Sequence, residues 1–316
     1  MEKLTTQKYL SVIIPLYKGE NFIEKLVIEL ELLASYLKDI VKLEIIFVDD
    51  GSPDETFAAV KRISTNHFKF QAIRLSRNFK SYIAILAGIH ECTGDYITIL
   101  PQDLQESTDL TVSLLSEIQK GYDVVWAVRR TRSDPFLSMF LSKCFHKLMN
   151  LIWSSWPDTG ADVFIITKPV AQMLVGMQEK NSHITGQIIW MGFKQTRIYY
   201  DRHARKIGKS GWNTFSKFKL AVDIITQFSY APIHLCTTVG IFTAALGFIY
   251  GIIITINKIF FNTTVSGWSS LMLVILLIGG IQLIFLGIIG EYLWRIFDEV
   301  RKRPAYIVME KLNHDE

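Results

Sequence analysis

Between Asp223 and Glu291 the chain carries a single formally charged side chain, Lys258. This stretch is long enough for two membrane-spanning helices of about 20 residues each, and we place them at residues 232–256 and 270–294. The residues before Asp223 are typical of a water-soluble protein. A soluble domain attached to a membrane hairpin indicates chemistry on a molecule that resides in the bilayer.

The basic residues around these spans predict how the chain crosses the membrane. They precede the first span and follow the second, and they are Lys209, Lys217, Lys219, Arg295, Arg301, Lys302 and Arg303. Because Lys and Arg favour the cytoplasmic side, we expect a multi-pass protein of the cell inner (plasma) membrane with both termini cytoplasmic. The net charge of +4 and the position of the basic residues beside the bilayer argue against a nucleic-acid partner.

The first part of the chain alternates between strand and helix patterns. We predict strands at residues 11–16, 43–48, 70–75, 95–100 and 123–128, and helices at 20–40, 53–64, 80–91 and 109–120. This alternation predicts an α/β fold with a mostly parallel, doubly wound sheet. We divide the chain into a cytoplasmic domain at 1–211, a juxtamembrane amphipathic helix at 212–230, two transmembrane helices within 231–294 and a cytoplasmic tail at 295–316.

Residues 135–156 include a helix pattern with one apolar face and an opposite face that carries Lys143 and Lys147. Such a helix can lie in the membrane interface or pack on the core as an ordinary surface helix. Trp153 and Trp156 favour the interface, where indole rings are enriched.

Acidic residues follow two of the predicted strands. Asp49 and Asp50 end the second strand, and in open α/β sheets ligands bind beyond the carboxyl ends of the strands. Carboxylates there can accept hydrogen bonds from a nucleobase or a ribose. The alternative is that Asp50 or Ser52 caps a helix that starts at Pro53, although two adjacent acids exceed what one cap needs.

Three further acids lie in loops. Asp103 follows the strand at 95–100, where a hard cation could bridge it to a diphosphate; it could equally be a turn residue. Asp158 and Asp162 precede the apolar run at 163–166. Either could position a substrate or act as a base, or serve only as a polar loop residue.

The last candidate site residues form two basic clusters. Arg202, Arg205 and Lys209 lie with two glycines in residues 200–212, a composition that suits a loop closing over phosphate. Contact with anionic lipid would explain the same charges. A second cluster, which could hold a lipid phosphate or anionic headgroups, consists of Arg129, Arg130 and Arg132.

Taken together, these motifs are more specific than any one of them. In chain order they read Val-Ile-Ile-Pro-Leu-Tyr at 12–17, Val-Asp-Asp-Gly-Ser at 48–52, Asp-Leu-Gln at 103–105, Arg-Lys-Ile-Gly-Lys-Ser-Gly-Trp at 205–212, Gly-Glu-Tyr-Leu at 290–293 and Arg-Pro at 303–304. In this order, and with two spans, the chain resembles the family 2 glycosyltransferases of the dolichol-phosphate mannosyltransferase type. Within them it is most similar to the bacterial bactoprenol (undecaprenyl phosphate) glucosyltransferases.

The resemblance implies a GT-A nucleotide-sugar fold and a hexosyltransferase that acts with inversion. The implied reaction moves a sugar, with glucose as the first choice, from a UDP-linked donor to polyprenyl (undecaprenyl) phosphate at the cytoplasmic membrane face. The product would be a lipid-linked monosaccharide for cell-surface glycan modification. Implied partners are the nucleotide sugar, polyprenyl phosphate, membrane lipids and further copies of the chain in a homo-oligomer.

The resemblance also assigns residues to roles. Catalytic roles fall to Asp162, Asp103 and Arg205. Nucleotide binding falls to Pro15, Tyr17, Asp49, Asp50, Ser52 and Gln102. Binding of the diphosphate and the lipid phosphate falls to Arg129, Arg132, Arg202, Lys209 and Ser210, and a Mg²⁺ or Mn²⁺ ion falls to Asp103.

One departure bears on the metal. The family usually has Asp-x-Asp where this chain has Pro101, Gln102 and Asp103, so the first metal-side carboxylate is missing and metal dependence is in doubt. That loss favours a rival function, a non-catalytic nucleotide-sugar-binding membrane scaffold. A second rival, a processive polysaccharide synthase, is disfavoured because residues 187–190 read Gln-Ile-Ile-Trp and lack the Arg-Trp pair of the Gln-x-x-Arg-Trp motif.

Overall fold

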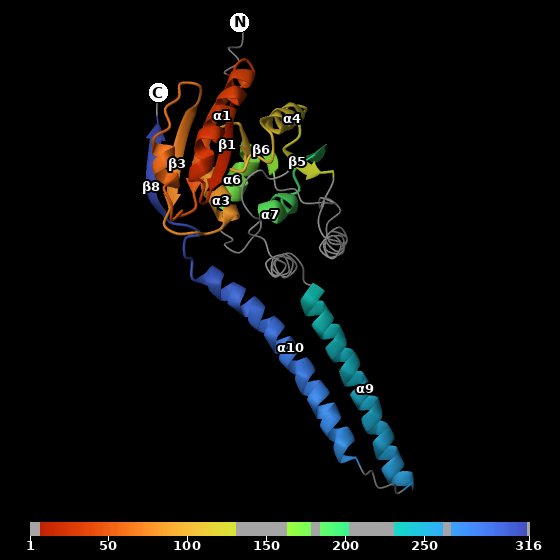
Figure 1. Cartoon of the computed structure of the whole chain (residues 1–316). Helices are drawn as coiled ribbons and strands as arrows, with labels where there is room; N and C mark the ends of the chain where they lie inside the picture. Colours follow the sequence, from red (N-terminus) through yellow and green to blue (C-terminus); the bar gives the residue numbers. More distant parts are fainter. Residues whose placement is uncertain (1–6, 131–162, 178–183, 202–230, 262–266, 315–316) are drawn as a thin grey trace. The chain divides into compact units, whose positions relative to one another are not determined.

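The computed structural model describes residues 7–130, 163–177, 184–201, 231–261 and 267–314. Contacts divide the chain into two units, one of residues 1–217 and 304–316 and the other of residues 218–303. In the described part of the first unit, the strands form one sheet in the order β7-β5-β6-β4-β1-β2-β3-β8. Figure 1 shows β3 and β8 side by side at one edge of it. Each unit is described by itself below.

The sheet is mostly parallel, as expected. Strands β1, β2, β3, β4, β5 and β7 share one direction, and β6 and β8 run against them. The strands are β1 (Tyr9–Leu16), β2 (Lys42–Asp49), β3 (Lys69–Leu75), β4 (Tyr96–Ile99), β5 (Val124–Arg129), β6 (Val163–Thr167), β7 (Gln195–Tyr200) and β8 (Val308–His314). The predicted α/β fold is therefore confirmed.

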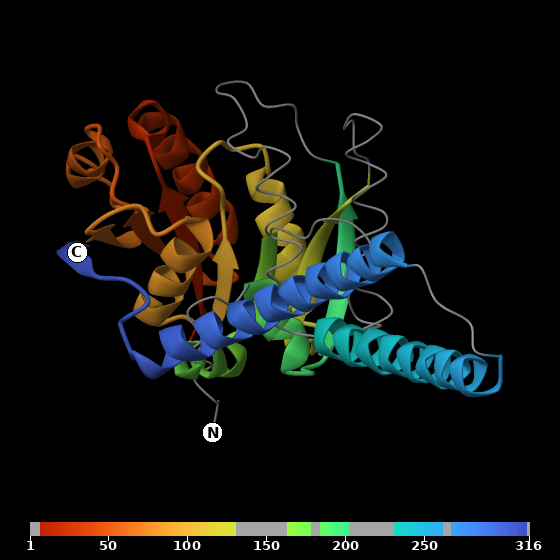
Figure 2. The same cartoon turned by 90° about the horizontal axis from the view of Figure 1, so that it is seen from below.

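Helices cover both faces of the sheet, which explains the nearly continuous apolar runs of its central strands. They are α1 (Ile23–Leu37), α2 (Thr56–Lys61), α3 (Ser81–Glu91), α4 (Thr108–Ile118), α6 (Lys168–Gly176) and α7 (Ile184–Trp190), with a 3-10 turn η1 (Glu20–Phe22) before α1. Figure 2 shows α1 and α4 on one side of the sheet and α3 on the other. Leu26 and Leu30 of α1 are fully buried against the sheet.

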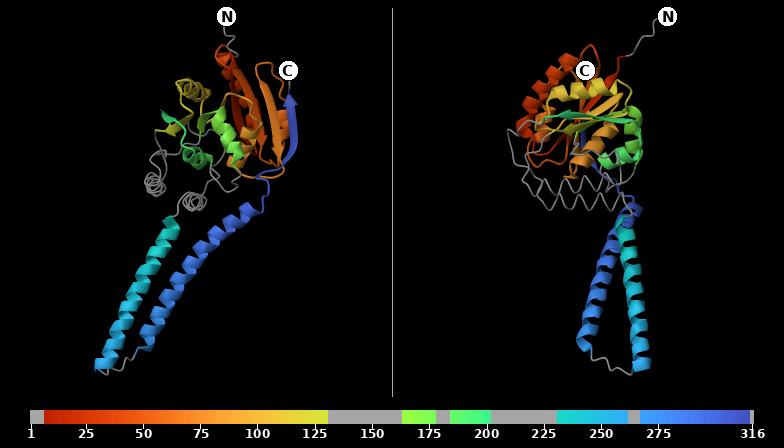
Figure 3. Two further views of the ribbon diagram at one scale, coloured as in Figure 1. Left: turned by 180° about the vertical axis from the view of Figure 1, so that it is seen from behind. Right: turned by 90° about the vertical axis from the view of Figure 1, so that its right-hand side faces the viewer.

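Strand β8 is a feature that the sequence patterns did not predict. Residues 295–316 were expected only as a tail, but in the structure α10 continues to Val300 and residues 308–314 add an antiparallel strand to the free edge of β3 (Figure 3). Ion pairs join β8 to the helices on both sides of the sheet, Glu310 with Lys61 of α2 and Lys311 with Glu91 of α3. The short pattern Val-Met-Glu-Lys-Leu is too polar to predict a strand without its partner.

The second unit contains the two predicted apolar helices. They are α9 (Ala231–Phe261) and α10 (Trp268–Val300), which run antiparallel in Figure 1. Within them, 236–257 and 277–300 are apolar enough to span a membrane. At 1.5 Å per residue a 22-residue span is about 33 Å long, matching the hydrocarbon core of a bilayer. The helices predicted at 135–156 and 212–230 lie outside the described residues.

Removing β8 should destabilise the soluble domain. A chain that ends at Pro304 exposes the backbone groups of β3 and the apolar residues beneath it, so we expect its Tm to fall by at least about 5 °C. Thermal unfolding of the detergent-purified protein, followed by tryptophan fluorescence, measures this. A chain that ends at His314 keeps β8 and serves as the control. An unchanged Tm for the shorter chain would show that β8 contributes nothing to the sheet.

Candidate active site

Four loops meet at the carboxyl edge of the sheet. Because β4, β1, β2 and β3 are parallel neighbours, the residues that follow them lie side by side, namely 100–107, 17–19, 50–55 and 76–80. Strand β6 begins at this same edge with Val163, since it runs against β4, and β7 ends there with Tyr200, since it runs parallel to β5. Among the described residues, the order of the strands therefore brings Tyr17, Asp49, Asp50, Ser52, Gln102 and Asp103 to one edge.

Asp49 is built into the sheet rather than exposed to solvent. It is 1% exposed; its Oδ1 accepts a hydrogen bond from the Ser52 N–H at 2.9 Å, and its Oδ2 lies 3.4 Å from Nε of Arg74. Burial raises the pKa of the Asp49 carboxyl, although the bonds from Ser52 and the charge of Arg74 oppose that rise. Asp49 therefore holds the loop after β2 against β3.

Asp50 joins the same loop to the one after β3. It is 3% exposed, and its two oxygens accept hydrogen bonds from the Phe79 N–H at 2.6 Å and the Lys80 N–H at 2.9 Å. Burial raises its pKa, while these bonds and the nearby Lys80 charge lower it. Gly51 lets the loops touch: its φ is +64°, and a β-carbon there would lie 2.4 Å from the carbonyl carbon of Arg77.

The alternative assignment of Asp50 or Ser52 as a helix cap is wrong. Helix α2 begins at Thr56, and neither residue caps it. Instead the Ser52 hydroxyl accepts a hydrogen bond from the Lys18 N–H at 3.0 Å, and the Thr56 hydroxyl accepts one from the Gly19 N–H at 2.8 Å. Both side chains thus attach the loop after β1 to the loop after β2.

Gln102 forms a second link across this edge. Its Oε1 accepts a hydrogen bond from the Tyr17 N–H and its Nε2 donates one to the Tyr17 carbonyl, both at 3.0 Å. Gly19 makes room for the amide, since a β-carbon there would lie 2.7 Å from Oε1 of Gln102. The loop after β1 is therefore fastened to the loop that carries Asp103.

Three non-glycine residues in these loops have positive φ: Lys18 at 53°, Lys80 at 81° and Leu104 at 50°. Such conformations cost on the order of 1 kcal/mol or more and persist where the surroundings fix them. The three loops are thus held in strained shapes by the hydrogen bonds just described, a condition that is common at functional sites.

The metal-ligating capacity of this edge is small. Asp103 is partly exposed and accepts a 3.4 Å hydrogen bond from the Gln105 N–H, whereas Asp49 and Asp50 are occupied as described. Within the residues that the structure describes, no group of three or more His, Cys, Asp or Glu could hold a metal. Mg²⁺ commonly takes one or two carboxylates together with substrate phosphates. Asp103 therefore fits a metal that arrives with a diphosphate, but not a metal held by protein alone.

Arg129 lies close to the buried carboxylate of Glu106. One of its terminal nitrogens is 3.9 Å from Glu106 Oε1, its Nε donates to the Tyr200 hydroxyl at 3.4 Å, and that hydroxyl donates to Glu106 at 3.2 Å. These contacts connect the ends of β5 and β7 to the segment before α4. Sequence reasoning missed Glu106 because its burial depends on partners far away in the chain.

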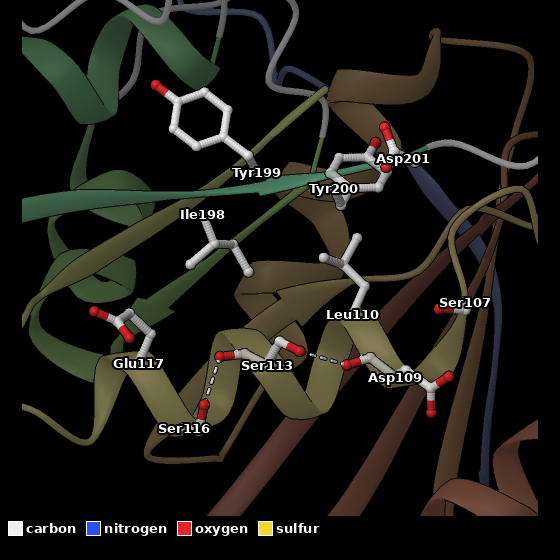
Figure 4. A pocket seen from close by; sticks show the side chains of 10 residues that line it. All are labelled: Ser107, Asp109, Leu110, Ser113, Ser116, Glu117, Ile198, Tyr199, Tyr200 and Asp201. Atoms are coloured by element: carbon white, nitrogen blue, oxygen red, sulfur yellow. Dashed lines mark hydrogen bonds between the residues drawn. The ribbon is translucent and has the colours of Figure 1, made fainter. Parts of the chain in front are cut away.

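A groove of about 410 Å³ lies between α4 and β7 (Figure 4). Its lining includes the hydroxyls of Ser113 and Ser116, which donate to carbonyls of their own helix. Strand β7 is five positions from β2 in the sheet, which places it about 24 Å away at 4.8 Å per strand. The β7 wall of the groove is therefore far from Asp49 and Asp50, while its other wall begins at Ser107, at the end of the loop after β4.

Of the other predicted site residues, two lie in the described part of the chain. Pro15 lies in β1, and Tyr17 is 40% exposed just after it. The remainder lie outside the described residues: Arg132, Asp158, Asp162, Arg202, Arg205, Lys209 and Ser210.

Comparison with known protein families agrees with this architecture. Residues 11–171 match the model for glycosyl transferase family 2, and residues 231–296 match the GtrB C-terminal hairpin. The chain belongs to glycosyltransferase family 2. It is thus a glycosyltransferase with the hairpin that follows the catalytic domain in GtrB-type members.

Individual relatives cover nearly the whole glycosyltransferase. An uncharacterized glycosyltransferase, YkcC, of Bacillus subtilis (strain 168) is 34% identical over 95% of this chain and 93% of its own length. The bactoprenol glucosyl transferase of Shigella phage SfX is 32% identical over 96% and 99%. The mannosyltransferase PcManGT from Pyrobaculum calidifontis shares the fold, with a TM-score of 0.51 at 18% identity over 71% of this chain and 64% of that one.

The link through Gln102 can be tested by a double-mutant cycle with Gly19. Gln102→Ala removes two hydrogen bonds and should cost about 1 to 3 kcal/mol of stability. Gly19→Ala alone should also destabilise, because its new methyl group meets the amide, but it should cost less in the Gln102→Ala background. Thermal unfolding of the four proteins measures the coupling. Gln119→Ala, at an exposed position, is the control, and strictly additive effects would exclude the contact.

Proposed function

We propose that this glycosyltransferase transfers a sugar, with glucose as the first candidate, from a nucleotide sugar to polyprenyl phosphate at the cytoplasmic face of the membrane. UDP is the first candidate for the nucleotide. The proposal draws on the bactoprenol glucosyl transferases among the relatives and on the family of the hairpin. The product would be a lipid-linked monosaccharide for modification of cell-surface glycans.

The observation that carries the proposal is where the sheet is connected to the hairpin. Strand β7 ends at the carboxyl edge with Tyr200, and the chain then leads to α9. After α10 the chain re-enters the sheet at the same edge, where Val308 pairs with Leu75 and the Ser76 N–H donates to Ile307 at 2.9 Å. Both connections to the apolar helices thus start from the edge that carries the candidate site. This arrangement suits a donor from water and an acceptor from the bilayer.

The same connectivity supports the predicted topology. The strands before and after the hairpin belong to one folded sheet, so they must lie on the same side of any membrane that the hairpin crosses. Two spans satisfy this requirement. The basic residues that flank the spans then favour the cytoplasm for both termini.

The proposed chemistry needs three groups of residues. Tyr17 and Gln102 would border the nucleotide together with Pro15, while Asp49, Asp50 and Ser52 would shape the loops around it. Asp103 would be the protein ligand of Mg²⁺ or Mn²⁺, which when bound with the donor would neutralise the diphosphate. Arg202, Arg205, Lys209 and Ser210 would hold the diphosphate as it departs, and Arg129 and Arg132 the lipid phosphate.

Asp162 would orient the acceptor. An acceptor phosphate is already anionic at neutral pH, so it requires positioning more than deprotonation. Its oxygen attacks the anomeric carbon as the bond to the diphosphate breaks on the opposite face, and the configuration is inverted. Support comes from Val163, the next residue, which begins β6 at the carboxyl edge; Asp158 is the competing candidate for this role.

A direct transfer assay tests the proposal. The purified protein, undecaprenyl phosphate and radiolabelled UDP-glucose should yield a labelled lipid in which the anomeric configuration of the donor is inverted. Undecaprenol, which lacks the phosphate, should yield none. Chelation of divalent cations should slow transfer, and Asp103→Asn should reduce it on the order of a hundredfold.

The same assay also decides between a glycosyltransferase and the rival function, a nucleotide-sugar-binding scaffold, which the missing acid at Pro101 favours. A scaffold would bind nucleotide sugars but would form no glycolipid with any donor in a panel of UDP and GDP sugars. Such a result would overturn the proposal.

Arg205→Ala separates a catalytic loop from a lipid contact. If Arg205 stabilises the departing diphosphate, kcat should fall on the order of a hundredfold while the affinity for UDP changes little. Lys219→Ala, in the basic stretch nearer the first span, is the matched control and should leave kcat close to wild type. Similar losses in both variants, restored by anionic lipid, would assign Arg205 to the membrane surface instead.

A further inference from the structure

Lys80 has a backbone conformation that glycine adopts readily and other residues rarely do. Its φ is 81° and its ψ is 157°, a region in which a β-carbon crowds the neighbouring backbone. A glycine would fit without strain, yet the chain has a lysine here. A non-glycine residue in a strained conformation suggests that its side chain has a function.

The loop cannot easily relax out of this shape. The Lys80 N–H donates to Oδ2 of Asp50, and the Phe79 N–H donates to Oδ1. Moving the loop would leave the buried carboxylate of Asp50 without these donors, which is costly. The contact between Gly51 and the backbone of Arg77 fixes the same loop from its other end.

The side chain itself is exposed, as are other cations of the loops after β1 and β3. Residues 17–19 and 76–80, the loops after β1 and β3, expose Lys18, Arg77 and Lys80 and contain no carboxylate. The acids at the end of β2, Asp49 and Asp50, are buried and already accept N–H groups. These two loops therefore present cations to solvent at the edge where a donor would bind, whereas the acids of the neighbouring loop, the half-buried Asp54 and the exposed Glu55, follow Ser52 toward α2. Exposed cations at such an edge attract a phosphate group.

We propose that Lys80 binds the phosphate groups of the donor nucleotide, and that this contact is the reason a lysine follows Phe79 where the backbone favours glycine. The proposal rests on the proposed function, because it takes the donor to be a nucleotide sugar bound at this edge.

Binding measurements on the full-length protein in neutral detergent test it. Isothermal titration calorimetry with UDP and with uridine separates the phosphates from the nucleoside. Lys80→Gly should weaken UDP binding about ten- to a hundredfold and leave uridine binding unchanged. At the same time its Tm should rise by about 2 to 10 °C, because the strain is relieved. Lys80→Arg, which keeps the charge, should retain most of the UDP affinity without the gain in Tm.

Lys302 provides a matched control. It is also a lysine with positive φ, 48°, but it lies between α10 and β8, so Lys302→Gly should not alter UDP binding. Unchanged UDP affinity in Lys80→Gly, equal losses for UDP and uridine, or no UDP binding by the wild type would each overturn the proposal. A loss that appears only in anionic vesicles would assign Lys80 to lipid headgroups. If Lys80→Gly binds UDP normally and still makes glycolipid, the proposal for Lys80 fails while the proposed function stands.

Discussion

The candidate site depends on one buried carboxylate. Asp50 directly follows β2 and accepts hydrogen bonds from the N–H groups of Phe79 and Lys80 in the loop after β3. Those two bonds bring adjacent loops together and hold Lys80 in a conformation that it would not adopt alone. Without them the buried charge would be unsatisfied, which is among the costliest defects in a folded chain.

This use of the acids changes how the motif should be interpreted. Asp49 and Asp50 have their oxygens directed at Ser52, Arg74 and the loop after β3, so they organise the site from within the protein. Exposed groups in the described part of these loops include Tyr17 and the cations Lys18, Arg77 and Lys80, and Asp103 is partly exposed. An acidic pair at the end of a strand can therefore specify the shape of a site while other residues supply its exposed surface.

Periodicity predicted the central part of the fold well. The strands at 43–48 and 70–75 and the helix at 80–91 were each found within about one residue of their predicted ends, because buried parallel strands and amphipathic helices have strong apolar patterns. The link from Gln102 to Tyr17 and the burial of Glu106 were not predicted. The link of Gln102 depends on Tyr17, 85 residues away, and Glu106 accepts a hydrogen bond from Tyr200, 94 residues away. Local patterns hold no information about such pairs. The same limit applies to β8, whose hydrogen-bonding partner β3 lies in the first quarter of the chain.

The path of the chain relates the apolar hairpin to the fold of the sheet domain. The hairpin is an insertion between β7 and β8, and the domain is complete only after the chain has returned. A strand supplied after the insertion requires both attachments to end on one side of the membrane, which a single span could not provide. Strand β8 also covers the edge of β3. The carboxyl end of β3 leads into the loop that Asp50 holds, so the strand that follows the hairpin supports the candidate site. Formation of the apolar hairpin and completion of this sheet edge are thus coupled in one chain.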